Sequence, residues 1–224
     1  MNTFSFVVLN YNRYDLVHQV LFDIYKTCSP VEEVLVVNNG CTELESFSGL
    51  DWWRNSGMLP IRELRLEENV GFLRASNAGI QESTGDVICL ISNDVRVRGD
   101  IVQRIHHVVK DNPKAMVGGR LLDWRTGWNN FKNTMCPYLE GWLLAATKDT
   151  WENIRYFDER FSPNDMEDVD ISTTVLNEGG ILVPLPEDIT HHIGAQSLGY
   201  NPEREILTKI NREKFREKWN LEYE

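Results

Sequence analysis

The fold of this chain is decided by residues 71–94, GFLRASNAGIQESTGDVICLISND. Gly71 to Glu82 is predicted to form a helix that packs closely, because it contains the small residues Ala75, Ser76, Ala78 and Gly79. Asp86 to Ile91 is an apolar run of strand length, and it ends in the polar turn Ser92-Asn93-Asp94. A helix that leads into a buried strand predicts one unit of a parallel sheet.

The same alternation occurs earlier in the chain. The apolar run Phe4 to Leu9 is followed by Asn10-Tyr11-Asn12 and by an amphipathic stretch with apolar Leu16, Val17, Val20, Leu21 and Ile24. Val34 to Val37 is a second strand that ends in Asn38-Asn39-Gly40, and Leu64 to Leu66 is expected to be a third. This order predicts an α/β fold with a mostly parallel central sheet flanked by helices. Ligands of such sheets bind beyond the carboxyl ends of the strands.

The second half of the chain is less regular. The expected elements are helices at Ile101 to Val109 and Val169 to Asn177, strands at Ala115 to Gly118 and Leu143 to Thr147, and a loop at Trp124 to Pro137. Glu203 to Trp219 is predicted to be a surface helix docked by its apolar stripe. We therefore expect one domain over residues 1–200, with residues 201–224 as a C-terminal helix packed on it.

Composition excludes several classes of protein. Of 224 residues, 42% are hydrophobic and 25% charged, as in ordinary globular proteins, and the net charge of −11 disfavours a nucleic-acid partner. No apolar run reaches the roughly 20 residues that span a bilayer, and the start Met1-Asn2-Thr3-Phe4 lacks a secretory leader, so a cytoplasmic protein is expected. Cys28, Cys41, Cys89 and Cys136 form no CxxC pair, which favours reduced thiols over zinc ligands or disulfides.

Acidic residues at two places are candidates for chemistry. Asp94 follows a buried strand, where its carboxylate suits either a divalent cation or a solvated turn. Glu167, Asp168 and Asp170, with Asp165 before them, lie at the start of a predicted helix. Helix capping is the simpler interpretation for Asp165 and Asp170, whereas clustered carboxylates also raise one another's pKa, as a general base requires. His191 and His192 suit either metal ligands or structural positions.

Taken together, these motifs resemble family 2 glycosyltransferases. The resemblance covers Phe4 to Arg13, Val36 to Gly40, and Glu68 to Ile80 followed by Gly85-Asp86 and Ile91 to Asp94. It continues in Phe157 to Phe161, in Glu167 to Asp170 and in His192 to Ser197, in the order found in the family. The nearest similarity is to the rhamnosyltransferase-like branch.

The resemblance implies a GT-A fold and an inverting transfer from a UDP, dTDP or GDP sugar to an acceptor hydroxyl, expected on a glycan. Tyr11 would stack on the base and Asn38 would recognise it, with Asn10, Asn12, Gly71, Arg74, Asn77 and Asn93 also at the donor. Asp94 would hold Mn²⁺ or Mg²⁺ with His192 as a further ligand. Asp168 would be the general base, with Glu167 as its alternative.

Some residues depart from the family pattern. Asn38 stands where Asp is usual, Ser92 and Asn93 replace a second acid, and Thr173 and Thr174 stand where a basic residue often follows. These departures leave open a non-catalytic member that binds a sugar nucleotide. A nucleotidyltransferase is a further alternative, although Asn10 to Arg13 lacks the glycine-rich loop that would hold a triphosphate. Trp124, Trp128 and Trp142 lie in the half expected to face the acceptor, where aromatic rings suit sugar faces, although a core position is the simpler interpretation for each of them.

Overall fold

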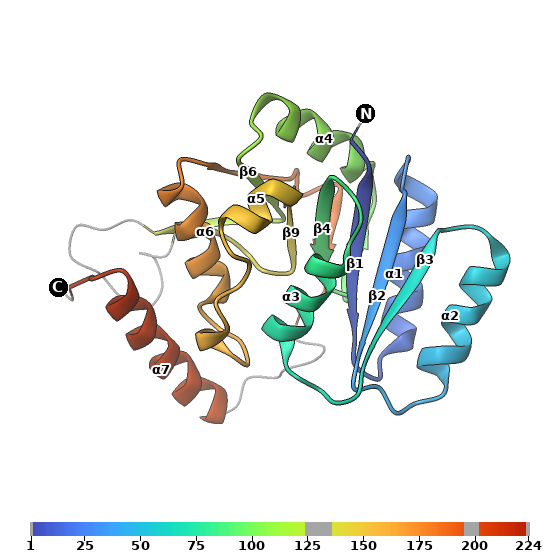
Figure 1. The fold of residues 1–224 in the computed structure, drawn as a ribbon, viewed down its shortest axis with the longest axis horizontal. Coiled ribbons are helices and arrows are strands. Elements are labelled where there is room, and N and C mark those ends of the chain that lie inside the picture. The colour runs from blue at the N-terminus through green and yellow to red at the C-terminus, as the bar shows by residue number, and fades with distance from the viewer. Residues whose placement is uncertain (1, 124–135, 195–201, 223–224) are drawn as a thin grey trace.

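A seven-stranded sheet forms the centre of the protein in the computed structural model, which describes residues 2–123, 136–194 and 202–222. The strand order is β10-β6-β9-β4-β1-β2-β3 (Figure 1). The strands are β1 (Phe4–Asn10), β2 (Glu33–Asn39), β3 (Ile61–Leu66), β4 (Val87–Ile91), β6 (Ala115–Gly118), β9 (Leu143–Thr147) and β10 (Ile181–Pro184). β9 runs antiparallel to β4 and β6, and the other neighbouring pairs are parallel. The predicted mostly parallel α/β sheet is confirmed.

Helices cover both faces of this sheet, because its central strands are apolar on both sides. The helices are α1 (Tyr14–Thr27), α2 (Glu45–Ser56), α3 (Phe72–Glu82), α4 (Ile101–Asp111), α5 (Lys148–Asn153), α6 (Glu167–Asn177) and α7 (Pro202–Lys218), and η2 (Glu159–Phe161) is a short 3₁₀ turn. α1, α2 and α4 pack with Phe6 and Val8 on one face, and α3, α5 and α6 pack with Val7 on the other (Figure 1). Alternate residues of β1 thus supply two cores.

The small residues of α3 allow it to approach the sheet closely, as the sequence predicts. A Cβ on Gly79 would lie 2.5 Å from Val7 Cγ1 and 2.8 Å from Val37 Cγ2. The residue at position 79 must therefore be glycine unless the helix moves outward.

The polar turns after β1, β2 and β4 lie together at the carboxyl ends of these parallel strands. Asn10 pairs in register with Asn38, and Val8 pairs with Ile91 at the end of β4. Two short ladders extend this region: β5 (Val95–Val97) pairs with β11 (Thr190–His192), and β7 (Leu121–Asp123) pairs with β8 (Pro137–Leu139). The segment after β4 is thereby joined to the histidine pair late in the chain.

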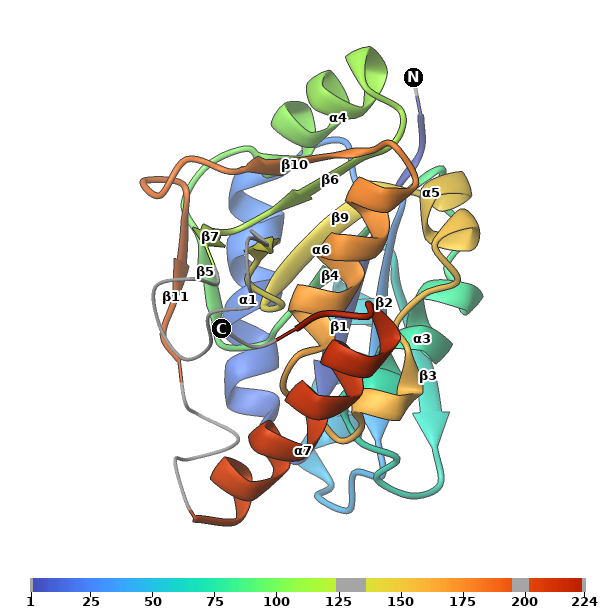
Figure 2. The same cartoon turned by 90° about the vertical axis from the view of Figure 1, so that its left-hand side faces the viewer.

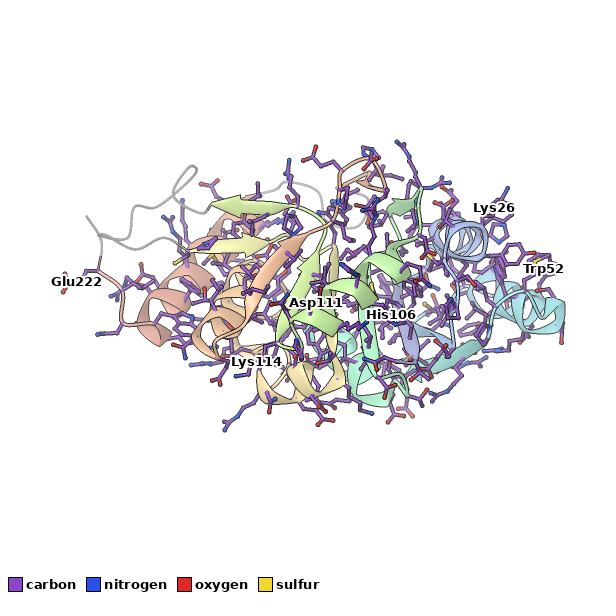
Figure 3. The ribbon with its side chains drawn as sticks, turned by 90° about the horizontal axis from the view of Figure 1, so that it is seen from above. Lys26, Trp52, His106, Asp111, Lys114 and Glu222 are labelled. Atoms are coloured by element: carbon purple, nitrogen blue, oxygen red, sulfur yellow. The ribbon has the colours of Figure 1, made fainter. Side chains whose placement is uncertain are left out.

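α7 packs beside α6, at the end of the molecule opposite to α1 and α2. Figure 1 shows this arrangement, Figure 2 shows α7 beside α6, and Figure 3 places Glu222, just after α7, far from Lys26 and Trp52. Phe215 is fully buried in the core beneath α6, and Trp219 packs against the same core. Ile206 and Ile210 of α7 are 59% and 49% exposed, so the predicted apolar stripe docks only in its second half.

Two other expectations concern the described residues. All four cysteines are free, and Cys28, Cys89 and Cys136 are buried. No helix within the described ranges combines the length and apolarity needed to cross a bilayer. Trp124, Trp128 and the motif residues Ala195, Gln196 and Ser197 lie outside the described residues.

Candidate active site

Asp94 and His192 lie side by side although 98 positions separate them in sequence. The antiparallel pairing of β5 with β11 places His192 opposite Val95 and brings its Nε2 to 3.2 Å from Asp94 Oδ1. The Ile193 amide also donates to the Asp94 carbonyl at 3.0 Å. The Asp94 side chain is 8% exposed and that of His192 is 31% exposed, so the pair faces solvent on one side only.

This pair suits a divalent cation that is completed by another molecule. Ligands that are neighbours on an octahedral ion with bonds of about 2.1 Å are about 3 Å apart, close to the 3.2 Å seen here. Within residues 2–123, 136–194 and 202–222, no group of three His, Cys, Asp or Glu residues is positioned to hold a metal. A cation here would depend on oxygen atoms from a bound ligand, such as a diphosphate. An imidazole in the ligand set favours Mn²⁺ over Mg²⁺.

Glu167 and Asp168 begin α6, and both are partly buried. Asp168 Oδ1 accepts a hydrogen bond from the Val169 amide at 2.9 Å, and Oδ2 accepts one from the Gly141 amide at 3.4 Å. Burial raises the pKa of Asp168 to about 6. Burial and the neighbouring Asp168 charge raise the pKa of Glu167 well above its ordinary value, and its Oε2 is buried with no hydrogen-bond partner among the described residues.

Residues 140–142 connect these two groups. The Gly141 amide binds Asp168, whereas the Trp142 ring stacks on His192 with centroids 5.3 Å apart and planes inclined by 18°. The Trp142 carbonyl accepts from the Ser92 amide at 2.9 Å, which fixes the segment to the turn that carries Asp94. The candidate base and the candidate cation ligands therefore share one neighbourhood.

Glu140 anchors this segment from the other side. Its carboxylate accepts from Trp142 Nε1 at 3.0 Å and from two nitrogens of Arg120 at 2.9 Å each. Trp142 is thus held by its indole nitrogen, its carbonyl and its stacked ring. The sequence presents Trp142 only as one of several aromatic residues, and no local signal indicates its stacking on His192.

The residues expected at the nucleotide base are unequal in exposure. Tyr11 is 52% exposed, as stacking on a base requires, whereas Asn10 and Asn38 are each 1% exposed. Asn10 Nδ2 donates to Asn38 Oδ1 at 2.8 Å, and Asn38 Nδ2 donates to Glu63 Oε1 at 2.6 Å. Both ends of the Asn38 amide are therefore engaged within the protein, and base recognition by Asn38 stays a prediction.

Two further asparagines, Asn12 and Asn39, stabilise the turns after β1 and β2 by hydrogen bonds. Asn12 Oδ1 accepts from the amides of Thr42 and Glu43 at 2.9 and 3.2 Å, so Asn12 does not cap α1. Asn39 Oδ1 accepts from the Val70 amide at 2.9 Å and connects the end of β2 to the loop before α3. Asn39, the second asparagine of the Asn38-Asn39-Gly40 turn, is therefore a structural residue that the sequence does not single out.

The remaining donor-side residues lie on and around α3. Gly71 is the N-cap residue of α3 and has a φ of 85°, a conformation that favours glycine. Arg74 Nε pairs with Glu159 Oε2 at 3.1 Å, and Asn77 donates to and accepts from the main chain of Phe157, both at 2.9 Å. Asn93 is 9% exposed between Ser92 and Asp94. Contact of these residues with a donor stays a prediction.

The helix-capping interpretation of Asp165 and Asp170 was wrong. Asp165 accepts from Arg204 at 2.7 Å and Thr208 at 2.8 Å, and Asp170 accepts from Lys218 at 2.7 Å and Trp219 at 2.9 Å. Both carboxylates therefore bind α7. Local sequence could not reveal these partners, because they lie 39 to 49 residues away.

Comparison with solved structures places this arrangement in the GT-A fold. GalNAc-T7 in complex with UDP, GalNAc and Mn²⁺ superimposes with a TM-score of 0.79 at 15% identity, over 97% of this chain and 48% of that one. The mannosyltransferase PcManGT from Pyrobaculum calidifontis, in complex with GDP-Man and Mn²⁺, gives 0.67 at 16% identity, over 88% and 58% of the two chains.

Sequence comparison identifies the family. The uncharacterized glycosyltransferase YwdF of Bacillus subtilis (strain 168) is 31% identical over 90 residues, which is 40% of this chain and 32% of that protein. The chain thus matches about a third of this relative's length. Residues 5–176 match the model of glycosyl transferase family 2. Because this match spans most of the chain, the protein belongs to glycosyl transferase family 2.

Proposed function

We propose that this protein transfers a sugar from a nucleotide-diphosphate sugar to an acceptor hydroxyl with inversion at the anomeric carbon. Asp168 acts as the general base, and Asp94 with His192 holds a cation at the diphosphate. The observation that carries this proposal is the 140–142 segment, since it contacts Asp168 through Gly141 and His192 through Trp142. One bound donor would thereby lie close to both Asp168 and the Asp94–His192 pair.

Asp168 suits the removal of a proton from a hydroxyl. With a pKa of about 6 it is ionised at pH 7, yet it is a stronger base than an ordinary aspartate. The acceptor oxygen bonds to the anomeric carbon, its proton passes to Asp168, and the bond to the nucleoside diphosphate breaks. A single displacement of this kind inverts the configuration. Glu167 is the alternative base: burial and the neighbouring Asp168 charge raise its pKa well above its ordinary value.

The cation would offset the charge that develops on the leaving diphosphate. This matters in a protein of net charge −11, which otherwise repels a diphosphate. Mn²⁺ is the preferred cation because His192 supplies nitrogen, and both structural neighbours described above are Mn²⁺ complexes.

The donor is proposed to be a UDP, GDP or dTDP sugar, and the acceptor a glycan hydroxyl in the cytoplasm. UDP and GDP-mannose are bound in the two structurally similar complexes described above. The dTDP sugar rests on the resemblance to the rhamnosyltransferase-like branch, which also makes rhamnose a donor sugar to test.

A donor screen tests the proposal. UDP-glucose, UDP-N-acetylgalactosamine, GDP-mannose and dTDP-rhamnose are each added with and without Mn²⁺, and the melting temperature and the release of nucleoside diphosphate are measured. We expect Mn²⁺-dependent stabilisation by at least one donor, slow transfer of its sugar to water, and inverted configuration of the released sugar by NMR. Stabilisation without turnover would favour the non-catalytic alternative. Pyrophosphate release from a nucleoside triphosphate and a sugar phosphate would favour a nucleotidyltransferase.

A further inference from the structure

α7 binds residues that precede and follow the candidate base, Asp168, in sequence. It pairs with Asp165 through Arg204 and Thr208, and with Asp170 through Lys218 and Trp219. Figures 1 and 2 show α7 beside the end of α6 at which that helix begins. Glu167 and Asp168 therefore lie between two points that are fixed to α7.

Asn211 is the central contact of α7 with the turn before α6. Its side chain is fully buried, and Nδ2 donates to the carbonyl oxygens of Phe161 at 2.8 Å, Asn164 at 2.8 Å and Asp165 at 3.1 Å. Its Oδ1 accepts from Lys214 Nζ at 2.9 Å, which fixes the orientation of the amide. Few other side chains could satisfy these carbonyls, because an NH₂ group is required where they converge.

The turn that Asn211 binds has an unfavourable backbone. Asp165 and Met166 have φ values of 70° and 75°, in the left-handed region that residues with side chains rarely adopt. Such a conformation persists where surrounding contacts impose it. The Met166 carbonyl then accepts from the Asp170 amide at 2.9 Å, so the turn sets where α6 begins.

We propose that Asn211 is a positioning residue for Asp168. By holding the 161–165 carbonyls it sets the start of α6, and with it the place of the Asp168 carboxylate relative to Gly141. This inference rests on the proposed function. It adds that α7 controls the chemical step but not donor binding. The expected donor and cation residues lie at the ends of β1 and β2, on and around α3, on β11 and in the turn after β4, whereas the Asn211 amide binds Phe161, Asn164 and Asp165.

The test compares Asn211→Asp with Phe215→Leu. The first variant removes the NH₂ group and places a carboxylate against the three carbonyls, whereas the second reduces apolar packing of α7 and leaves the Asn211 amide in place. With the donor that stabilises the wild type most, and with Mn²⁺, we expect Asn211→Asp to lower kcat about 100-fold, as a displacement near 1 Å can do, and to change KM less than twofold. Phe215→Leu should leave kcat within about threefold.

Hydrogen exchange of residues 161–170 supplies a readout that does not need activity. We expect faster exchange there in Asn211→Asp than in Phe215→Leu at equal melting temperature. If Asn211→Asp fails to fold, Arg204→Gln tests the same turn, with a smaller loss of kcat and unchanged KM. An unchanged kcat or unchanged exchange in the folded variant would overturn this inference alone, while a wild type that turns over none of the four donors would overturn the proposed function as well.

Discussion

Replacing Asp168 by asparagine should stabilise the protein at neutral pH while removing its proposed base. The folded protein raises the pKa of this carboxyl from 3.8 to about 6. Its protonated form is therefore favoured by folding. The associated stability is present below about pH 4 and is lost as the pH rises through 6. An asparagine is never charged, so it does not suffer this loss.

The magnitude follows from the two pKa values. At about 1.4 kcal/mol per pKa unit, ionising Asp168 at pH 7 costs about 3 kcal/mol. The asparagine oxygen can accept from either Val169 or Gly141 but not from both as the carboxylate does, and the lost hydrogen bond costs about 1 kcal/mol. The net gain is about 2 kcal/mol at pH 7 and falls below about 1 kcal/mol at pH 5, where much of the carboxyl in the folded protein is protonated.

Urea unfolding at pH 5 and pH 7 measures this gain, because urea is uncharged and leaves electrostatic interactions unscreened. Asp149→Asn serves as the control, since Asp149 is exposed on α5. It should change the free energy of unfolding by less than about 0.5 kcal/mol at either pH. An Asp168→Asn variant that is less stable than the wild type at pH 7, or whose gain is equal at both pH values, would show that folding does not raise the pKa of Asp168.

Three shorter predictions concern other parts of the molecule. Donor turnover should rise with pH through about 6 as Asp168 ionises, and a flat kcat/KM between pH 5 and 8 would contradict this. Asp94→Ala should abolish Mn²⁺-dependent donor binding in calorimetry, whereas unchanged binding would exclude Asp94 as a ligand. Gly79→Ala should lower the free energy of unfolding in urea by about 1–3 kcal/mol, because the added Cβ would lie 2.5 Å from Val7 Cγ1. Alanine favours helices more than glycine does, so an equally stable variant would contradict the close packing of α3.

Elements with a long apolar pattern were predictable from the sequence. The strands at Phe4 and Val34 and the helix at Phe72 are among these, since each buries a regular row of side chains. α2 was missed because it buries only Ser46, Leu50 and Trp53, too few residues to give a clear period. β5 and β11 have three residues each and exist through their pairing, which no local pattern reveals. The antiparallel direction of β9 is likewise set by its neighbours.

The candidate site was predictable in its residue types but not in its connections. Asp94 stands out in the sequence because it follows a buried strand, and Asp168 stands out because it lies at the start of a helix. They are connected by Gly141, which donates to Asp168, and by Trp142, which stacks on His192 beside Asp94, and this segment has no chemical signal of its own. The buried position of Asn38 was also unpredictable, because Glu63 on the next strand binds its amide.

We propose that Asp94 and Asp168 act on the same bound donor in different roles. Measurements of donor affinity and donor turnover, both with Mn²⁺, in the wild type, Asp94→Ala and Asp168→Asn would separate these roles. We expect Asp168→Asn to bind the donor as tightly as the wild type without turning it over, and Asp94→Ala to lose donor binding. Wild-type turnover by Asp168→Asn, or unchanged binding by Asp94→Ala, would contradict this proposal.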